Sequence, residues 1–165
     1  MKKLLFLLLL IPLVSFGQLK YKDIMKLDSK DAFEKLMFDK QFSITDQKDD
    51  YNSLHYALNP TYKDGEVLST HFAQYTPIID NWFFTFMRRG TSTNLYSGVV
   101  TDAGIMANDY DSILKKVKRK CEFVKMHTLS ATYACYSCKD AEFDGYIAFS
   151  IIDGQGAITT FKSLD

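Results

Sequence analysis

The sequence has no excess of charge of either sign, because 20 Lys and Arg residues balance 20 Asp and Glu residues. Proteins that bind nucleic acid or an anionic membrane surface carry a strong net positive charge or a polybasic patch. A near-neutral chain therefore argues against nucleic acid and against a membrane surface as the partner.

Motifs that bind a metal, a cofactor or a substrate are also missing. The chain has no HExxH, no G-x-S-x-G and no glycine-rich phosphate loop between a strand and a helix. Asp140, Glu142 and Asp144 lie close in sequence, but they lack the twelve-residue order and the closing glutamate of a calcium-binding EF-hand loop. The sequence therefore predicts neither a metal ion nor a cofactor, and it favours a non-enzymatic protein.

The chain has no apolar run long enough to cross a membrane. The run Leu4–Val14 has eleven residues, whereas a membrane-spanning helix needs about 20. Lys2 and Lys3 precede this run, and Ser15-Phe16-Gly17 places small residues at the −3 and −1 positions of a cleavage site. Residues 1–17 resemble a bacterial secretory signal peptide that is removed after Gly17.

Removal of this leader would leave residues 18–165 as a single compact domain of 148 residues, counted as 165 minus 17. That length is enough for a hydrophobic core. Loss of Lys2 and Lys3 leaves 18 basic and 20 acidic residues, a net charge of −2. No cysteine directly follows the apolar run, so we expect no lipid anchor. The sequence predicts an exported protein, periplasmic or secreted.

Cysteine is scarce, since the chain has only Cys121, Cys135 and Cys138. The last two have the C-x-x-C spacing, but they fall in or at the end of a predicted strand. Thioredoxin-type motifs need the first cysteine at a helix N-terminus. In an oxidising compartment we expect one disulfide, from Cys121 to either Cys135 or Cys138. Such a bridge would stabilise the fold by about 3 kcal/mol. Free buried thiols are the alternative, and redox or metal chemistry is a third.

Aromatic residues, in contrast, are abundant, with ten Tyr, thirteen Phe and one Trp. Such residues favour strands. In the run Trp82–Met87 apolar side chains occupy both faces, which predicts a central strand of a sheet. The second face of this strand would be covered by the other half of the chain, or else by a partner protein.

Residues 109–161 predict a helix followed by three strands. In the helix, Asp109–Cys121, apolar residues recur at helical spacing and form one stripe. Five basic residues occupy its other faces and crowd its C-terminal turns, where they complement the helix dipole. The strands are predicted at Leu129–Ser137, Tyr146–Ile152 and Ala157–Phe161, and a turn containing two glycines joins the last two.

The first half of the chain repeats this pattern at an offset of 81 residues, the distance from Phe42 to Phe123. Its helix and strands are predicted at Ser29–Lys40, Tyr51–Leu58, Val67–Tyr75 and Asn81–Arg88. We therefore predict an α+β fold of tandem helix-plus-three-strand units, residues 18–101 and 102–165, with a mostly antiparallel sheet and helices on one face. Chance similarity between two ordinary amphipathic units is the alternative.

Two histidines mark a candidate ligand-binding surface. If residues whose numbers sum to 126 pair across the first two predicted strands, His55 lies opposite His71. Tyr51 and Tyr75 then share their face, and the four side chains could stack on and hydrogen-bond to a small ligand. No carboxylate is fixed nearby by spacing, and cross-strand pairing without a function is the alternative.

These observations predict an exported, non-enzymatic binding protein of the bacterial envelope, acting through a sheet face or the groove between repeats. Its partner would be another envelope or secreted protein. The layout is similar to that of tandem-repeat exported inhibitor proteins and small envelope assembly modules, a likeness that involves no shared motif residues. A small-ligand or glycan-binding protein is the alternative, and an enzyme without a recognisable motif is a third.

Overall fold

The computed structural model describes residues 18–47, 49–86, 92–93, 100–101 and 109–165. The predicted signal peptide, Met1–Gly17, lies outside the described residues. Among the helices that are described, none combines the length and the apolar character needed to span a membrane.

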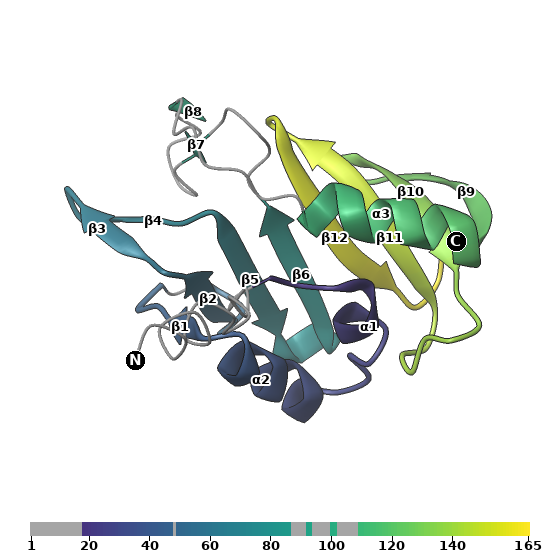
Figure 1. The fold of residues 1–165 in the computed structure, drawn as a ribbon, viewed down its shortest axis with the longest axis horizontal. Helices are drawn as coiled ribbons and strands as arrows, with labels where there is room; N and C mark the ends of the chain where they lie inside the picture. Colours follow the sequence, from purple (N-terminus) through teal and green to yellow (C-terminus); the bar gives the residue numbers. More distant parts are fainter. Residues whose placement is uncertain (1–17, 48, 87–91, 94–99, 102–108) are drawn as a thin grey trace, which may run out of the picture.

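An eight-stranded sheet, antiparallel at every pairing, forms the framework (Figure 1). From one edge to the other its strands are β1 (Phe42–Ile44), β2 (Leu54–Leu58), β5 (His71–Thr76), β6 (Asn81–Phe86), β12 (Gln155–Phe161), β11 (Tyr146–Ile152), β10 (Thr132–Ser137) and β9 (Glu122–Thr128). The first four come from the first half of the chain and the last four from the second half. The halves meet where β6 pairs with β12. The predicted mixture of helices with a mostly antiparallel sheet is confirmed.

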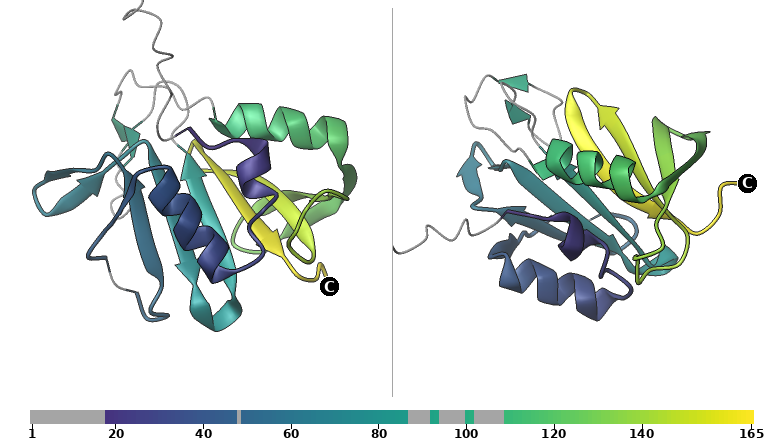
Figure 2. Two further views of the ribbon diagram at one scale, coloured as in Figure 1. Left: turned by 60° about the horizontal axis from the view of Figure 1, so that its bottom comes forward. Right: turned by 45° about the vertical axis from the view of Figure 1, so that its right-hand side comes forward.

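Three helices lie on one face of this sheet, with the short α1 (Tyr21–Ile24) between the two longer ones (Figure 2). Helix α2 (Lys30–Asp39) is capped by Ser29, whose Oγ accepts a hydrogen bond from the backbone N–H three residues later at 3.2 Å. Helix α3 (Asp109–Lys120) ends in a turn that carries three basic residues. The apolar stripe and cap signals predicted both long helices to within a residue or two.

Each long helix is followed by four strands of the main sheet, whereas the sequence predicted three. The unpredicted strands are β1 and β9, the two edges of the sheet. An edge strand makes contacts on one side only, so its sequence is less constrained to be apolar than that of a central strand. The prediction that Trp82–Phe86 lies in a central strand is confirmed, while Met87 lies outside the described residues.

The predicted strand Val67–Tyr75 is wrong as a single strand. Its first part belongs to β4 (Glu66–Leu68), which pairs with β3 (Thr61–Lys63) in a separate hairpin. Asp64 and Gly65 turn this hairpin with φ of 52° and 80°, the left-handed values that a two-residue turn requires. The sheet pairing restarts only at β5. A third, two-residue pairing joins β7 (Ser92–Thr93) to β8 (Val100–Thr101).

The core lies between the helices and the facing side of the sheet. Phe33 of α2 is fully buried at its centre, with ring centroids 5.7–5.8 Å from those of Tyr56, Tyr75 and Phe84. Such tilted and edge-on aromatic pairs add about 0.5–1.5 kcal/mol each beyond their buried area. Residues of both halves of the chain belong to this one cluster.

On the opposite face of the sheet the described part of the chain places no helix (Figure 2). Over its second half, Leu164 near the C-terminus packs on Tyr133, Cys135 and Ala148 in a smaller apolar cluster. Over its first half, Val67 of β4 packs on Ala57 and the neighbouring phenylalanine of β5. Short segments of chain therefore cover parts of this face.

Candidate binding surface

The predicted pairing of the two histidines is wrong. Strand β2 pairs with β5 so that Leu54 lies opposite Tyr75 and His55 opposite Gln74, which means that paired numbers sum to 129 rather than 126. A shift by an odd number of residues turns a side chain to the other face of a sheet. His55 therefore lies on the face without helices, whereas His71 lies on the helix-covered face. The register was misjudged because the β3–β4 hairpin takes up part of the segment assigned to the second strand.

The structure does not bring the four predicted ligand-binding residues together. Tyr51 is 62% exposed in the turn before β2. His55 and His71 are buried on opposite faces, and Tyr75 lies under α2 in the aromatic core. No single surface made of these four side chains exists.

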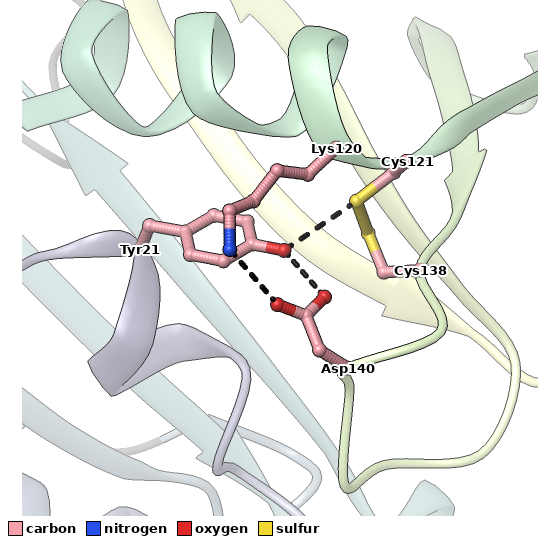
Figure 3. Close-up of a disulfide and its surroundings, with 5 residues drawn as sticks. All are labelled: Tyr21, Lys120, Cys121, Cys138 and Asp140. Carbon is pink, nitrogen blue, oxygen red and sulfur yellow. Dashed lines mark hydrogen bonds and ion pairs between the residues drawn. A yellow bond between two sulfur atoms is a disulfide. The ribbon is translucent and has the colours of Figure 1, made fainter.

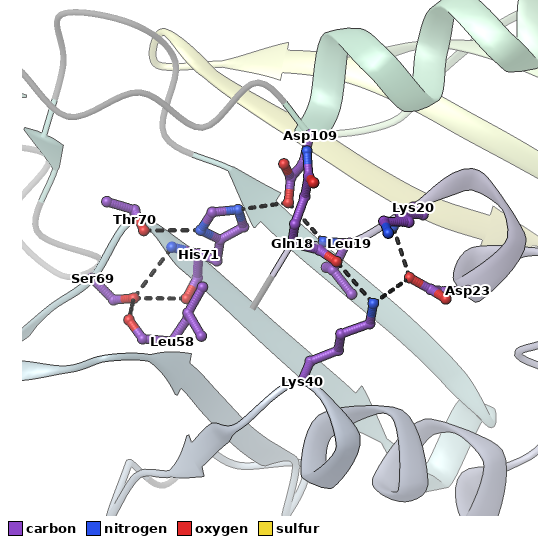
Figure 4. Close-up of polar contacts among 10 residues, drawn as sticks. All are labelled: Gln18, Leu19, Lys20, Asp23, Lys40, Leu58, Ser69, Thr70, His71 and Asp109. Atoms are coloured by element: carbon purple, nitrogen blue, oxygen red, sulfur yellow. Dashed lines mark hydrogen bonds and ion pairs between the residues drawn. The ribbon is translucent and has the colours of Figure 1, made fainter. Parts of the chain in front are cut away.

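His71 instead belongs to a buried polar cluster (Figure 4). Its Nε2 lies 3.1 Å from Oδ2 of Asp109, and its Nδ1 lies 2.9 Å from the hydroxyl of Thr70. The same Asp109 oxygen accepts the backbone N–H of Leu19 at 2.7 Å. Because a carboxylate only accepts hydrogen bonds, Nε2 of His71 is the donor to Asp109.

The order hydroxyl, imidazole, carboxylate is that of a hydrolytic triad. The His71 and Asp109 side chains are only 8% and 6% exposed, however, and Asp109 also holds the backbone of Leu19. Such a carboxylate joins three segments of the fold: the start of the described chain, β5 and α3. We assign this cluster a structural role, since a substrate has no access to its central atoms.

A second set of contacts fixes the segment before α1 (Figure 4). The ammonium of Lys40 donates to the carbonyl of Gln18 at 2.8 Å and lies 2.7 Å from the carboxylate of Asp23. That carboxylate also accepts the backbone N–H of Lys20 at 2.9 Å. The start of the described chain is thus held against both α2 and α3.

Cys121 and Cys138 form a disulfide that joins the end of α3 to the segment after β10 (Figure 3). Cys135 is the remaining cysteine, and it is a free thiol with no exposed surface. Burial raises the pKa of this thiol above its ordinary value, which makes it a poor nucleophile. The structure therefore gives the C-x-x-C pair no dithiol chemistry.

Three side chains surround the disulfide (Figure 3). The Tyr21 hydroxyl donates to Asp140 at 2.5 Å and lies 3.7 Å from the sulfur of Cys121. The Lys120 ammonium lies 3.5 Å from the Asp140 carboxylate and 5.1 Å from the centroid of the Tyr21 ring. The hydrogen bond from Tyr21 holds the pKa of Asp140 below its usual range. Burial, with Asp140 beside it, raises the pKa of Tyr21.

The free edge of β9 is the most exposed apolar part of the sheet. Six of the seven residues of this strand are exposed, and the seventh is half-buried. We define the β9 surface by its large apolar side chains and the one that follows them, which are between 41% and 60% exposed: Phe123, Val124, Met126 and Leu129. Exposed apolar side chains grouped along one edge strand make the β9 surface a candidate for interaction with another molecule.

The edge of β9 keeps one of two common protections against pairing with other chains. Proteins place a lysine or a β-bulge at an exposed edge to prevent pairing with other chains. A register shift in the β9–β10 pairing leaves Val124 as an extra residue. Lys125 is present, but its ammonium donates to the carbonyl of Leu164 across the sheet. The positive charge is therefore held over the sheet face and does not project from the edge.

Two hollows contain residues with polar side chains of interest. One, of about 270 Å³, lies between the start of α2, the β5–β6 turn and the end of β12. There Tyr75 donates its hydroxyl proton to Asp80, and burial together with this carboxylate raises the pKa of Tyr75 to about 12. The other hollow, of about 110 Å³, contains His55 on the face without helices. Among the described residues no three His, Cys, Asp or Glu side chains are placed to hold a metal ion.

Comparison with protein-family models, with curated proteins and with solved structures finds no match to this chain. We therefore infer the function from the exposed surfaces and cavities of the structure.

Proposed function

We propose that the protein is an exported, non-enzymatic binding module that adds an extended segment of a partner protein to the free edge of β9. The exposure of that edge carries the proposal, since no described strand pairs with the outer side of β9 and the strand carries several exposed apolar side chains. An added strand gains main-chain hydrogen bonds from the edge, and alternate side chains provide specificity.

Charge favours an acidic partner segment. Lys118, Arg119 and Lys120 are exposed in the last turn of α3, and β9 begins two residues after it. A segment with alternating apolar residues and nearby carboxylates would match both the β9 surface and this basic turn. We therefore expect the partner to be an envelope or secreted protein with an extended, acidic and partly apolar segment.

A second copy of this chain matches the edge less well. Two β9 strands paired antiparallel about their centre would place Lys125 opposite Lys125, because this residue is the middle of the seven. Like charges directly opposite each other destabilise a strand pair. The basic turns of the two α3 helices would also approach each other.

The test is a selection of binders from a displayed library of random peptides long enough to form one strand. Selected peptides should alternate apolar residues and be enriched in Asp and Glu. Their binding should slow amide hydrogen exchange in residues 122–128, because outward-facing amides become paired. Peptides that protect other segments and leave this strand unchanged would contradict the proposal.

A matched pair of variants separates the edge from general surface apolarity. Phe123→Lys with Met126→Lys should weaken peptide binding by at least about tenfold, which corresponds to about 1.4 kcal/mol. Ile78→Lys with Ile79→Lys removes side chains that are 75% and 61% exposed elsewhere, and it should leave binding unchanged. Equal losses in both variants would mean that the peptides bind without use of β9.

The two halves, residues 18–101 and 102–165, are also proposed to be repeats of one unit. The strand order supports this, because it runs β1-β2-β5-β6 and then β12-β11-β10-β9, so that the last strands of the halves meet in the middle. Superposing β1, β2, β5 and β6 on β9, β10, β11 and β12 in an experimental structure should place α2 on α3. A displacement larger than a helix diameter, about 10 Å, would contradict a repeat.

Export is part of the same proposal, with periplasm or secretion as the destination. Mass spectrometry of protein recovered from a bacterial periplasmic or culture fraction should show a chain that begins at Gln18. Protein that stays in the cytosol and keeps residues 1–17 would contradict it.

A further inference from the structure

A small cavity lies on the face of the sheet without helices, away from the β9 surface. Its volume is about 110 Å³, and its polar side chains are Gln47, His55, Gln74 and Thr85. The aromatic walls are Phe72 and Phe83. We call it the Gln47 pocket.

The floor of the Gln47 pocket is built from cross-strand neighbours. His55 of β2 lies opposite Gln74 of β5, and Gln74 lies opposite Phe83 of β6. In the next row of the same face, Phe72 lies opposite Thr85. Directly opposite residues of antiparallel strands share a face, so these side chains point to the same side. The floor is therefore held by the sheet itself.

The roof comes from the segment before β2, which Asp49 holds in place. Its Oδ1 accepts the backbone N–H groups of Tyr51 at 3.0 Å and Ser53 at 2.9 Å. Its Oδ2 accepts the side-chain amide of Gln74 at 3.2 Å. The roof is thus tied to the floor.

Three polar atoms of the Gln47 pocket are buried without a hydrogen-bond partner among the described residues. They are Oε1 and Nε2 of Gln47, and Nε2 of His55. His55 is 9% exposed, and its Nε2 lies 3.4 Å from Oδ2 of Asp49 without the geometry of a hydrogen bond. Buried polar atoms in native proteins are paired with protein, water or a ligand. These atoms therefore point to an occupant.

The chemistry of these atoms limits what the occupant can be. The Gln47 amide offers both an acceptor and two donors, so a matching group must both donate and accept. The Asp49 carboxylate beside His55 disfavours an anion, and a simple cation would leave the Gln47 N–H groups unpaired. Phe72 and Phe83 supply apolar contact for C–H groups. We propose that the Gln47 pocket binds one edge of a neutral sugar or polyol through adjacent hydroxyl groups.

The size of the pocket agrees with this occupant. A volume of about 110 Å³ equals that of three to four waters at about 30 Å³ each, which is room for two neighbouring hydroxyls and their carbons. Gln74 and Phe83 are half-buried, so the pocket reaches the surface and the rest of the ring can extend into solvent. The proposal does not depend on the β9 surface.

The test is an NMR titration of the ¹⁵N-labelled chain with glucose, galactose, mannose and glycerol, up to about 100 mM because weak single-sugar binding lies near the millimolar range. At least one probe should shift the Gln47 side-chain amide and the His55 ring signals in a saturable way. Gln47→Leu and His55→Phe should weaken that probe at least about tenfold, while His127→Phe on β9 should not.

The other outcomes are equally decisive. No saturable shift with any of the four probes would overturn the proposal and assign the Gln47 pocket to ordered water. Saturable binding of acetate or ammonium in place of the neutral probes would also overturn it. If Gln47→Leu does not fold, as judged by its amide spectrum, the wild-type titration and His55→Phe, compared with His127→Phe, still decide.

Discussion

Removing the buried carboxylate of Asp109 should destabilise the protein, because two buried donors depend on it. Asp109→Ala removes the acceptor for the backbone N–H of Leu19 and for Nε2 of His71. Both residues are buried, with 1% of Leu19 and 7% of His71 exposed. Each buried donor left unpaired costs about 1–3 kcal/mol, so both together cost about 2–6 kcal/mol. Loss of a negative charge from the first turn of α3 adds about 0.3–1 kcal/mol.

Asp109→Asn separates these contributions. Both donors bond to the same oxygen, Oδ2, which the amide oxygen of Asn can replace. The expected loss is therefore that of the negative charge at the first turn of α3, about 0.3–1 kcal/mol. Urea unfolding can be followed by the fluorescence of Trp82, the single tryptophan, which is buried beneath the helices. The exposed Asp39 provides the control, since Asp39→Ala should change stability by no more than about 0.5 kcal/mol. A loss below about 1 kcal/mol in Asp109→Ala would refute the structural role of the cluster.

Three further outcomes follow from other parts of the structure. Replacing Cys121 and Cys138 by alanine should cost about 3 kcal/mol in the same unfolding assay, from the closure entropy of a loop with a sequence separation of 17; an unchanged midpoint would contradict this. Asp80→Asn should lower the pKa of Tyr75 from about 12 towards 10, as followed by NMR of ring-labelled tyrosine. In the wild type the raised pKa contributes stability below pH of about 10, and this contribution is lost as the pH rises through about 12. Gly156→Ala should cost about 1–3 kcal/mol by calorimetry, because its Cβ would overlap a buried aromatic ring; unchanged stability would mean that the ring moves freely.

The sequence predicted those elements whose signals are local. The helix over residues 109–121 was found from its apolar stripe and acidic start, and the structure has Asp109–Lys120. The strand Tyr146–Ile152 was predicted to the residue, because Asp153 and Gly154 mark a two-residue turn with φ of 48° and 78°. These features depend on neighbours in the chain and need no knowledge of the rest of the fold.

Features that depend on distant neighbours were predicted incorrectly or not at all. The choice between Cys135 and Cys138 needed the faces of β10, because Cys135 lies on the face away from α3 while Cys138 lies beyond the end of the strand. The pairing of His55 failed for a similar reason, since register is set by the whole hairpin. The edge strand β9 contains Phe123, Val124 and Met126 without a regular alternation. Its exposure follows from its position at the end of the sheet, where the described residues provide no ninth strand.

One residue of the predicted ligand surface belongs to the Gln47 pocket that we propose as a binding site. His55 does line a polar cavity, as a residue of the predicted ligand surface. Gln47, whose amide is the main sign of an occupant there, was not singled out, because a glutamine in a polar loop has no sequence signal that separates a buried amide from a solvated one. Its burial arises from the way Asp49 folds the segment back over β2 and β5.

The pairing of β6 with β12 determines when the sheet can be completed during folding. Phe86 and Gly156 face each other across it although 70 residues, 156 minus 86, separate them. A chain that emerges N-terminus first must keep β6 unpaired along one side until nearly all of it has been delivered. Such distant pairings slow folding, and an open aromatic strand invites association with other chains in the meantime. Truncation before Gln155 would therefore open the middle of the sheet and not merely shorten its rim.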